Sequence, residues 1–252
     1  MMTPEQRYLF DVTGYLHLEN AIQGEELKAA QVAADTYINT PTEELPDGFD
    51  SSGKHLPNGF AFSRALEALA LHPASWQIIR ELTDNKPQLA RGTMIADRIG
   101  VPEGGDALRL HCAREDYGRD RNCFENRNGT IYCDDFVVFP YLTDVYPGDG
   151  GLLIVPGSHK AEYDRPKHIF NNGTIDDVDN IPLGVENITP KAGDILIIFR
   201  TFNARCVTLE TDRPVSLLPR LTLQTPRQRR KPRANRGKRT FSTRNIGTHL
   251  PR

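Results

Sequence analysis

The chain has 252 residues, of which 38% are hydrophobic and 25% are charged. This composition supports one folded core of ordinary size and excludes a wholly disordered chain. The formal net charge of −2 conceals an uneven distribution, because ten of the 31 lysine and arginine residues lie in residues 226–252, which contain no acidic residue. We therefore expect a single acidic domain over residues 1–225 and a basic, disordered tail over residues 226–252.

The sequence shows no signal for membrane insertion, secretion or cross-linking. No apolar stretch reaches the ~20 residues that span a membrane, and the N-terminus MMTPEQRYLF lacks the regions of a signal peptide. The four cysteines have no paired spacing that would indicate a disulfide framework. We expect a cytoplasmic protein, and the sequence leaves its oligomeric state open.

The first ninety residues have mainly helical patterns. Residues 24–37 place apolar side chains at helical spacing behind an acidic first turn. Residues 62–82 show the same spacing, and we expect Pro73 to split them into two helices. The polar, glycine-rich residues 47–58 are predicted to form a loop long enough to act as a lid.

From residue 90 onward the pattern changes to short β-type runs separated by Gly, Pro, Asn and Asp. The seven predicted strands are residues 93–98, 107–111, 130–133, 136–142, 152–155, 186–188 and 195–199. Short strands with turn residues between them are typical of a β sandwich or barrel. Together with the preceding helices, they predict a mainly β jelly roll buttressed by helices.

The stretch LTDVYPGDGGLLIVPGSHK, residues 142–160, is the most specific in the sequence. Its Asp-Gly-Gly predicts a tight turn, and Pro156 with Gly157 predicts a second turn that presents Ser158 and His159. This block resembles the phytanoyl-CoA dioxygenase family of iron(II)/2-oxoglutarate oxygenases. The segments FDVTGYLHLENAI, LALHPASWQIIREL, LRLHCA and KAGDILIIF resemble it too, in family order over residues 10–199. The resemblance implies a double-stranded β-helix (a cupin-like jelly roll), with Fe(II) as cofactor and 2-oxoglutarate as co-substrate.

The resemblance also implies an iron site of two histidines and usually one carboxylate. It places the first histidine at His111, for which a structural role is the alternative. Ala113 stands at the usual carboxylate position, and this departure leaves hydroxylation and halogenation both open. Asp116, with Glu115 beside it, is the candidate for a shifted metal ligand, and surface charge is the alternative for both.

A second histidine is missing where the resemblance expects it. After GDILIIF, the His-Gly pair of the family would fall near Arg205, and a guanidinium cannot bind a metal. Arg213 and Arg220 are candidates to bind the far carboxylate of 2-oxoglutarate, because a guanidinium pairs well with a carboxylate. Ser158 and His159 are further candidates for cofactor binding, although a lone loop histidine more often has a structural role.

Family-like sequence ends at Phe199, which suggests either a reading-frame shift or divergence by substitution, and we place the frame shift first. Codons for residues 200–206 can be chosen so that the next frame encodes Glu-Arg-Leu-Thr-His-Gly, the kind of segment that the resemblance leads us to expect. Either cause predicts incomplete or aberrant C-terminal strands.

Three functions remain open at this point. The first is an oxygenase that hydroxylates an unidentified small organic substrate, with contacts from residues 47–58 or 115–128. The second is an inactive pseudo-oxygenase, which the literal sequence fits better because it lacks the second metal histidine. Nucleic-acid binding through the basic tail ranks last, since no groove-reading motif accompanies it.

Overall fold

The computed structural model describes residues 1–96, 124–133, 135–146, 151–161, 163, 181, 183–199, 204–207 and 217–224. Within these ranges the helices are α1 (Pro4–Thr13), α2 (Gly24–Asn39), α3 (Arg64–Ala70) and α4 (Pro73–Leu82). The strands are β1 (Tyr15–Leu18), β2 (His55–Leu56), β3 (Gln88–Ala96), β4 (Phe124–Arg127), β5 (Thr130–Cys133), β6 (Asp135–Pro140), β7 (Gly151–Ile154), β8 (Glu186–Ile188), β9 (Ile195–Phe199), β10 (Ala204–Val207) and β11 (Leu217–Gln224). None of the described helices is both long and apolar enough to cross a membrane.

Local capping signals set the helix ends. Thr3 and Gln6 form a reciprocal capping box at the start of α1, and Gly14, with a φ of 83°, ends this helix. Pro73 opens α4, where the His72 side chain accepts a hydrogen bond from a backbone amide of the first turn. The predicted split at Pro73 is therefore confirmed, because proline interrupts a helix interior but fits the first turn of a new helix.

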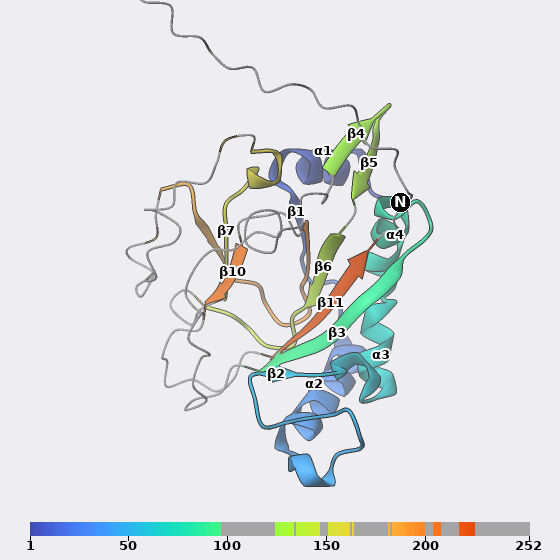
Figure 1. The fold of residues 1–252 in the computed structure, drawn as a ribbon, viewed down its shortest axis with the longest axis vertical. Helices are drawn as coiled ribbons and strands as arrows, with labels where there is room; N and C mark the ends of the chain where they lie inside the picture. The colour runs from blue at the N-terminus through green and yellow to red at the C-terminus, as the bar shows by residue number, and fades with distance from the viewer. Residues whose placement is uncertain are drawn as a thin grey trace, which may run out of the picture.

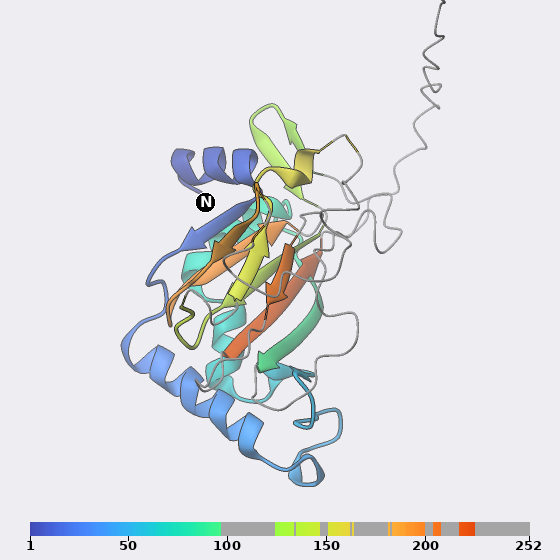
Figure 2. The ribbon, with the colours of Figure 1, turned by 90° about the vertical axis from the view of Figure 1, so that its left-hand side faces the viewer.

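The strands form two facing sheets and a separate hairpin. The larger sheet is antiparallel and has the order β1-β9-β6-β11-β3-β2, the smaller has the order β10-β7-β8, and β4 pairs with β5. Figures 1 and 2 show the smaller sheet on one side of the larger sheet and the helices α2, α3 and α4 on the other. The described chain is thus built in three layers, with the larger sheet in the middle.

Side chains of the larger sheet alternate between two apolar layers. Phe136 and Val138 of β6 belong to the cluster that the sheet shares with the helices, which we call the helix-side cluster. Val137 and Phe139 belong to the cluster between the two sheets, which we call the inter-sheet cluster. Alternate residues of β9 divide between the same two clusters. A strand buried on both faces needs an unbroken apolar run, which explains the sequence ILIIF.

The structure confirms most of the predicted strands. Residues 130–133, 186–188 and 195–199 are strands with the predicted bounds, and β3, β6 and β7 differ from the predictions only at their ends. The predicted strand at residues 107–111 lies outside the described residues. The structure adds β1, β2, β4, β10 and β11, which carry too short or too mixed a pattern to predict from sequence.

The strands after Phe199 take part in both sheets. β11 lies in the interior of the larger sheet, paired with β3 along its length and with β6 along residues 221–224. The prediction of incomplete C-terminal strands is therefore wrong for this sheet, because β11 joins β3 to β6. Its irregularities are local. Pro219, which has no amide hydrogen to donate, pairs with β3 alone, and the register shifts between Thr222 and Leu223.

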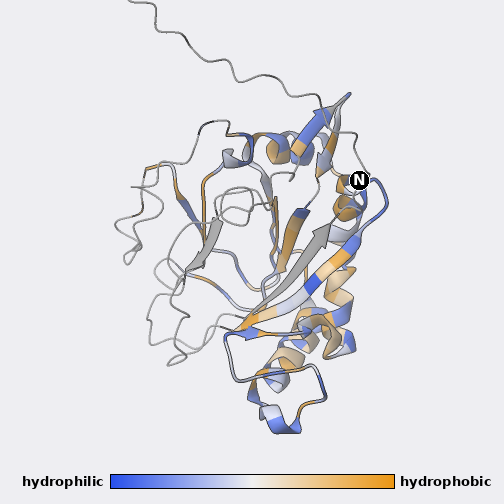
Figure 3. Cartoon of the chain, viewed as in Figure 1, coloured by the Kyte–Doolittle hydropathy of each residue, from blue (hydrophilic) through white to orange (hydrophobic). Residues whose placement is uncertain are grey.

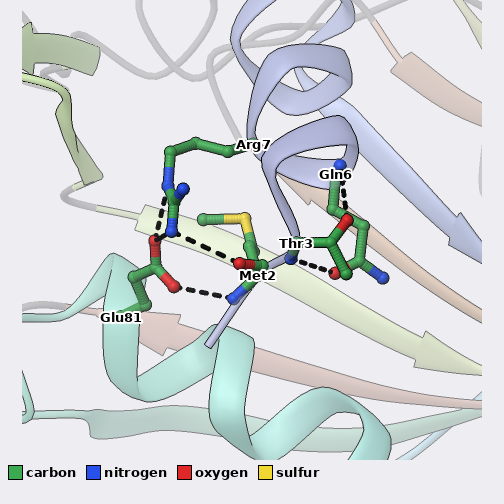
Figure 4. A network of polar contacts seen from close by, with 5 residues as sticks. All are labelled: Met2, Thr3, Gln6, Arg7 and Glu81. Carbon is green, nitrogen blue, oxygen red and sulfur yellow. Dashed lines mark hydrogen bonds and ion pairs between the residues drawn. The ribbon is translucent and has the colours of Figure 1, made fainter.

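A polar network fastens the N-terminal residues to α4 (Figure 4). Glu81 accepts a hydrogen bond from the backbone amide of Met2 at 2.7 Å, and from Nε and Nη2 of Arg7 at 2.9 and 2.7 Å. Arg7 also donates to the carbonyl oxygen of Met2 at 3.3 Å. The side chains of Arg7 and Glu81 are 33% and 13% exposed, so water only partly screens this ion pair.

The turn before β9 forms hydrogen bonds with the residues that follow β1. Gly193 has a φ of 94°, and its carbonyl oxygen accepts the backbone amide of Ile22 at 2.8 Å. A Cβ at Gly193 would collide with the carbonyl oxygen of Ile22, so both the dihedral angle and the close approach require glycine. Asp194 accepts the amide of Asn20 at 2.7 Å and lies 2.7 Å from Nε2 of His17. Burial disfavours the charged carboxylate, but these hydrogen bonds outweigh it and hold the pKa of Asp194 below its usual value.

Candidate functional site

The candidate site lies at one end of the space between the two sheets. At this end β9 and β11 terminate and β6 begins, because Phe136 pairs with Phe199 and Asp135 pairs with Gln224. Strand β10 begins within reach of this end, since five residue steps from Phe199 to Ala204 span at most about 19 Å. The residues that pack between the two sheets are apolar, namely Ile95, Val137, Phe139, Tyr141, Val145, Leu152, Ile154, Leu196 and Ile198.

Asp135 is the acidic residue that β6 brings to this end. It precedes Val137 and Phe139 by two and four positions, so the strand alternation places it on the inter-sheet face. Asp135 is only 2% exposed. Figure 3 shows the contrast between the hydrophilic start of β6 and the hydrophobic remainder of the strand. Sequence analysis missed this residue, although its alternation with Val137 and Phe139 in DDFVVFPYL is a usable signal.

Strand β10 contains the positions at which the resemblance expects the second histidine. Its sequence is Ala-Arg-Cys-Val, without a histidine. Ala204 pairs with Ile154, a member of the inter-sheet cluster, whereas Arg205 pairs with Leu153, which is not a member. Directly paired residues share a face of a sheet, so position 204, and not position 205, corresponds to the inter-sheet face.

Strand β11 brings one of the two candidate arginines into the larger sheet. Leu218 pairs with Ile95, a member of the inter-sheet cluster, and Arg220 pairs with Thr93 two positions further along. Because alternate positions of a strand share a face, the register places position 220 on the inter-sheet side. The other candidate, Arg213, lies outside the described residues.

His159 lies on the helix side of the larger sheet, in the short helical turn η3 (Ser158–Lys160). Its Nε2 is 3.1 Å from the carbonyl oxygen of Asp11 in α1. Its ring packs edge-on against Phe124, with 4.5 Å between the ring centroids, and lies 6.2 Å from the ring of Phe199. Phe199 belongs to the helix-side cluster, so these contacts lie outside the inter-sheet space.

These surroundings determine the charge of His159. Burial is the main cause that lowers the pKa of His159 to about 4; the nearby Lys160 lowers it further, and the contact with Asp11 opposes the shift. Lys160 forms an ion pair with Asp11 at 2.9 Å and lies over the ring of Phe124. Ser158 is buried in the same turn. The contacts support the structural interpretation of His159, and cofactor binding by Ser158 or His159 stays a prediction.

The remaining predicted site residues, namely His111, Asp116 and their neighbours Ala113 and Glu115, lie outside the described residues. Among the residues that are described, no three His, Cys, Asp or Glu side chains gather into a group that could hold a metal ion. Asp135 is a buried oxygen donor of the kind that an iron(II) site accepts. The described ranges therefore contain no complete metal site, and the metal ligands predicted at His111 and Asp116 stay predictions.

The predicted lid, residues 47–58, is a loop that contains the short strand β2 and is tied down at several points. The hydroxyl of Tyr37 donates to the carbonyl oxygen of Pro57 at 2.6 Å. The side-chain amide of Asn58 donates to the carbonyl oxygen of Gly48 at 2.8 Å. The hydroxyl of Ser51 donates to the carbonyl oxygen of Thr40, directly after α2, at 2.6 Å, and β2 pairs with β3. These contacts describe an anchored loop, and its role in substrate binding stays a prediction.

Solved structures of other proteins share this fold, and two of the three that follow have 2-oxoglutarate bound. HygX from Streptomyces hygroscopicus, solved with nickel and 2-oxoglutarate bound, is 21% identical, with 89% of this chain and 88% of HygX covered and a TM-score of 0.68. EctD from S. alaskensis, solved with 2-oxoglutarate and 5-hydroxyectoine, is 15% identical over 89% of this chain and 76% of EctD, with a TM-score of 0.64. The carbocyclase SnoK from nogalamycin biosynthesis is 16% identical over 89% and 84%, with a TM-score of 0.58.

The sequence itself identifies the family. The family model of phytanoyl-CoA dioxygenase (PhyH) matches residues 10–200, which is most of the chain. The chain therefore belongs to the phytanoyl-CoA dioxygenase family. Comparison with curated proteins gave no match.

Proposed function

We propose that the chain is an iron(II)/2-oxoglutarate oxygenase that hydroxylates a small organic molecule. The observation that carries the proposal is membership of the phytanoyl-CoA dioxygenase family over residues 10–200, and the fold shared with HygX supports it. We further propose that the two facing sheets are the halves of a double-stranded β-helix within one domain of residues 1–225. A HygX structure also holds hygromycin B, which supports a small organic molecule as the substrate here.

In this proposal, the residues of the chain would have the following roles. His111 would bind the iron, and Arg220 or Arg213 would pair with the far carboxylate of 2-oxoglutarate; the register of position 220 on the inter-sheet side supports Arg220. The apolar walls, such as Val137 and Ile198, would exclude water from the bound co-substrate. Bound iron would supply the oxygen chemistry, in which 2-oxoglutarate, O2 and an aliphatic C–H group would give succinate, CO2 and the hydroxylated product.

A second candidate is an inactive pseudo-oxygenase of the same fold. The sequence of β10 favours it, because the strand offers no histidine at the inter-sheet position 204 or beside it. A divalent ion held without a second histidine would bind weakly, and turnover would be lost. Nucleic-acid binding by residues 226–252 and a cytoplasmic location stay predictions.

Formation of succinate from 2-oxoglutarate separates the two candidates. The purified full chain would be incubated with Fe(II), ascorbate, oxygen and 2-oxoglutarate, and the succinate formed would be measured. Succinate that is lost in His111→Ala and kept in the matched control His249→Ala would support the oxygenase. No succinate above the metal-free background would refute the oxygenase and leave the pseudo-oxygenase.

A further inference from the structure

We propose that the turn η3 and the end of α1 form a latch between the two sheets, and that the smaller sheet opens first at this latch. The other end of the space between the sheets is fixed, so opening at the latch leaves the rest of the fold in place. The latch acts at the end where the candidate site lies. The inference does not depend on the proposed function, because it concerns contacts among described residues alone.

The latch consists of contacts between the chain that leaves β7 and the end of α1. The backbone amide of Gly157 donates to the carbonyl oxygen of Thr13 at 2.8 Å. The ring of His159 donates from Nε2 to the carbonyl oxygen of Asp11 at 3.1 Å, since a carbonyl oxygen can only accept. Lys160 forms an ion pair with the carboxylate of Asp11 at 2.9 Å. Figure 1 shows η3, in yellow, beside α1.

These contacts join one sheet to the other. The residues directly after α1 belong to the larger sheet, because the carbonyl oxygen of Gly14 accepts the amide of Phe199 at 3.0 Å and Tyr15 pairs with Ile198. The turn η3 follows β7, which lies in the middle of the smaller sheet. The latch therefore fastens the end of β7 to the end of β9.

The opposite end of the space is held by buried hydrogen bonds. There the chain after β6, which leads to β7, lies against the chain between β8 and β9, so both segments pass from one sheet to the other. The amide of Tyr141 donates to the carbonyl oxygen of Asp194 at 2.8 Å, and the amide of Val145 donates to that of Pro190 at 2.9 Å. Tyr141 and Val145 are 0% exposed and Asp194 is 4% exposed, which makes this the fixed end.

The difference in exposure decides which end opens first. The side chains of Lys160 and Asp11 are 43% and 29% exposed, so water weakens their attraction. Local opening takes place where few contacts are buried. The chain from Phe199 to Ala204 also crosses between the sheets at the latch, but its five steps can span about 19 Å, whereas packed sheets lie about 10 Å apart. This connection therefore permits the end of β7 to move away from the larger sheet.

Hydrogen exchange of the full chain at neutral pH, followed by NMR amide by amide, tests the inference. The amide of Gly157 reports the latch, and the amide of Val145 reports the fixed end. In the unchanged chain the amide of Gly157 should exchange at least about tenfold faster than the amide of Val145, relative to their rates in an unfolded chain.

Two variants test which contacts fasten the latch. Lys160→Met removes the ion pair but keeps an apolar chain over the ring of Phe124, and it should raise the exchange rate of Gly157 about threefold. His159→Phe keeps an aromatic ring but removes the hydrogen bond to Asp11, and it should raise this rate about fivefold.

The fixed end supplies a matched control. Lys191 also lies over an aromatic ring, with its Nζ 4.0 Å from the ring centre of Tyr146. Because Lys191 stands next to Pro190 at the fixed end, Lys191→Met should leave the exchange of Gly157 unchanged.

Each outcome bears on the latch. Faster exchange of Gly157 in Lys160→Met and His159→Phe, with Val145 unchanged, would support it. An equal rise at both amides would overturn it, because the two ends would then open in one event. No rise at Gly157 in either variant would show that these contacts do not fasten the turn. If His159→Phe does not fold, the unchanged chain still decides: a Gly157 amide protected as well as that of Val145 would refute the latch.

Discussion

Protonation of His159 should destabilise the fold as the pH falls below neutral. Burial against Phe124 is the main reason that the pKa of His159 falls from 6.5 to about 4 in the folded chain. In the unfolded chain the side chain takes up a proton at its ordinary pKa, so the unfolded state binds more protons between these two values. The stability that neutral His159 contributes is therefore complete above about pH 6.5 and is lost as the pH falls towards 4.

The size of this loss follows from the shift. A pKa lowered from 6.5 to about 4, at ~1.4 kcal/mol per unit, corresponds to a loss of about 3 kcal/mol by the time the pH reaches the folded pKa. Domains are stable by only about 5–15 kcal/mol, so the effect should dominate the acid side of the stability profile.

Urea denaturation of the full chain between about pH 7 and about pH 4.5 would measure this loss. His159→Phe keeps an aromatic ring against Phe124 and Phe199 but cannot be protonated, and carboxylates titrate equally in both proteins. The unfolding free energy of the unchanged chain should therefore fall by up to about 3 kcal/mol more than that of His159→Phe over this range. Parallel pH profiles would refute the reasoning, because they would mean that His159 is protonated as readily in the folded chain as in the unfolded chain.

Two further predictions concern stability. Glu81→Ala should lower the free energy of unfolding by about 2 kcal/mol, because the backbone amide of Met2 and the guanidinium of Arg7 lose their acceptor. A double-mutant cycle with Arg7→Ala, measured by urea denaturation, should give a coupling energy of ~1 kcal/mol between the two side chains. A coupling energy of zero would contradict this prediction. Gly193→Ala should cost more than about 2 kcal/mol, whereas Gly184→Ala, at a φ of 84° but with open space around it, should cost about 1 kcal/mol. If chemical denaturation shows that Gly193→Ala and Gly184→Ala lose equal free energy of unfolding, the predicted collision of the added Cβ at Gly193 does not destabilise the fold.

The strands that the sequence predicted best are those buried on both faces or flanked by clear turns. β9 was predicted to the residue because an apolar run between Gly193 and a charged residue has few alternative interpretations. The sequence does not predict β1, because Tyr15 and His17 interrupt its apolar pattern, and its partner β9 lies far along the chain, where Asp194 contacts His17. Such pairing is a tertiary effect that local propensity does not encode.

The candidate site was harder to predict than the fold, because its residues come together only through strand pairing. His159 stands in the most specific motif, and the structure shows its ring packed against Phe124; its predicted role in cofactor binding stays a prediction. Asp135 stood in no motif, and only the register and its burial bring it to notice. Strand alternation, applied to Asp135, assigns this residue to the inter-sheet face, which no motif in the sequence indicates.

The pairing of β11 bears on the cause of the missing histidine. Leu217, Leu221 and Leu223 all pair with members of the helix-side cluster, whereas the polar residues Thr222 and Gln224 pair with residues of the inter-sheet face. A strand translated in the wrong frame has no reason to alternate in this way, so the present frame fits the fold again by residue 217. A frame shift would then have to begin after Phe199 and be compensated before Leu217, which requires two events. Divergence by substitution in β10 requires only the loss of one side chain. The register therefore favours divergence, and both causes stay predictions. Coding DNA that reads His-Gly in the next frame across residues 200–206, with a compensating shift before residue 217, would contradict this conclusion.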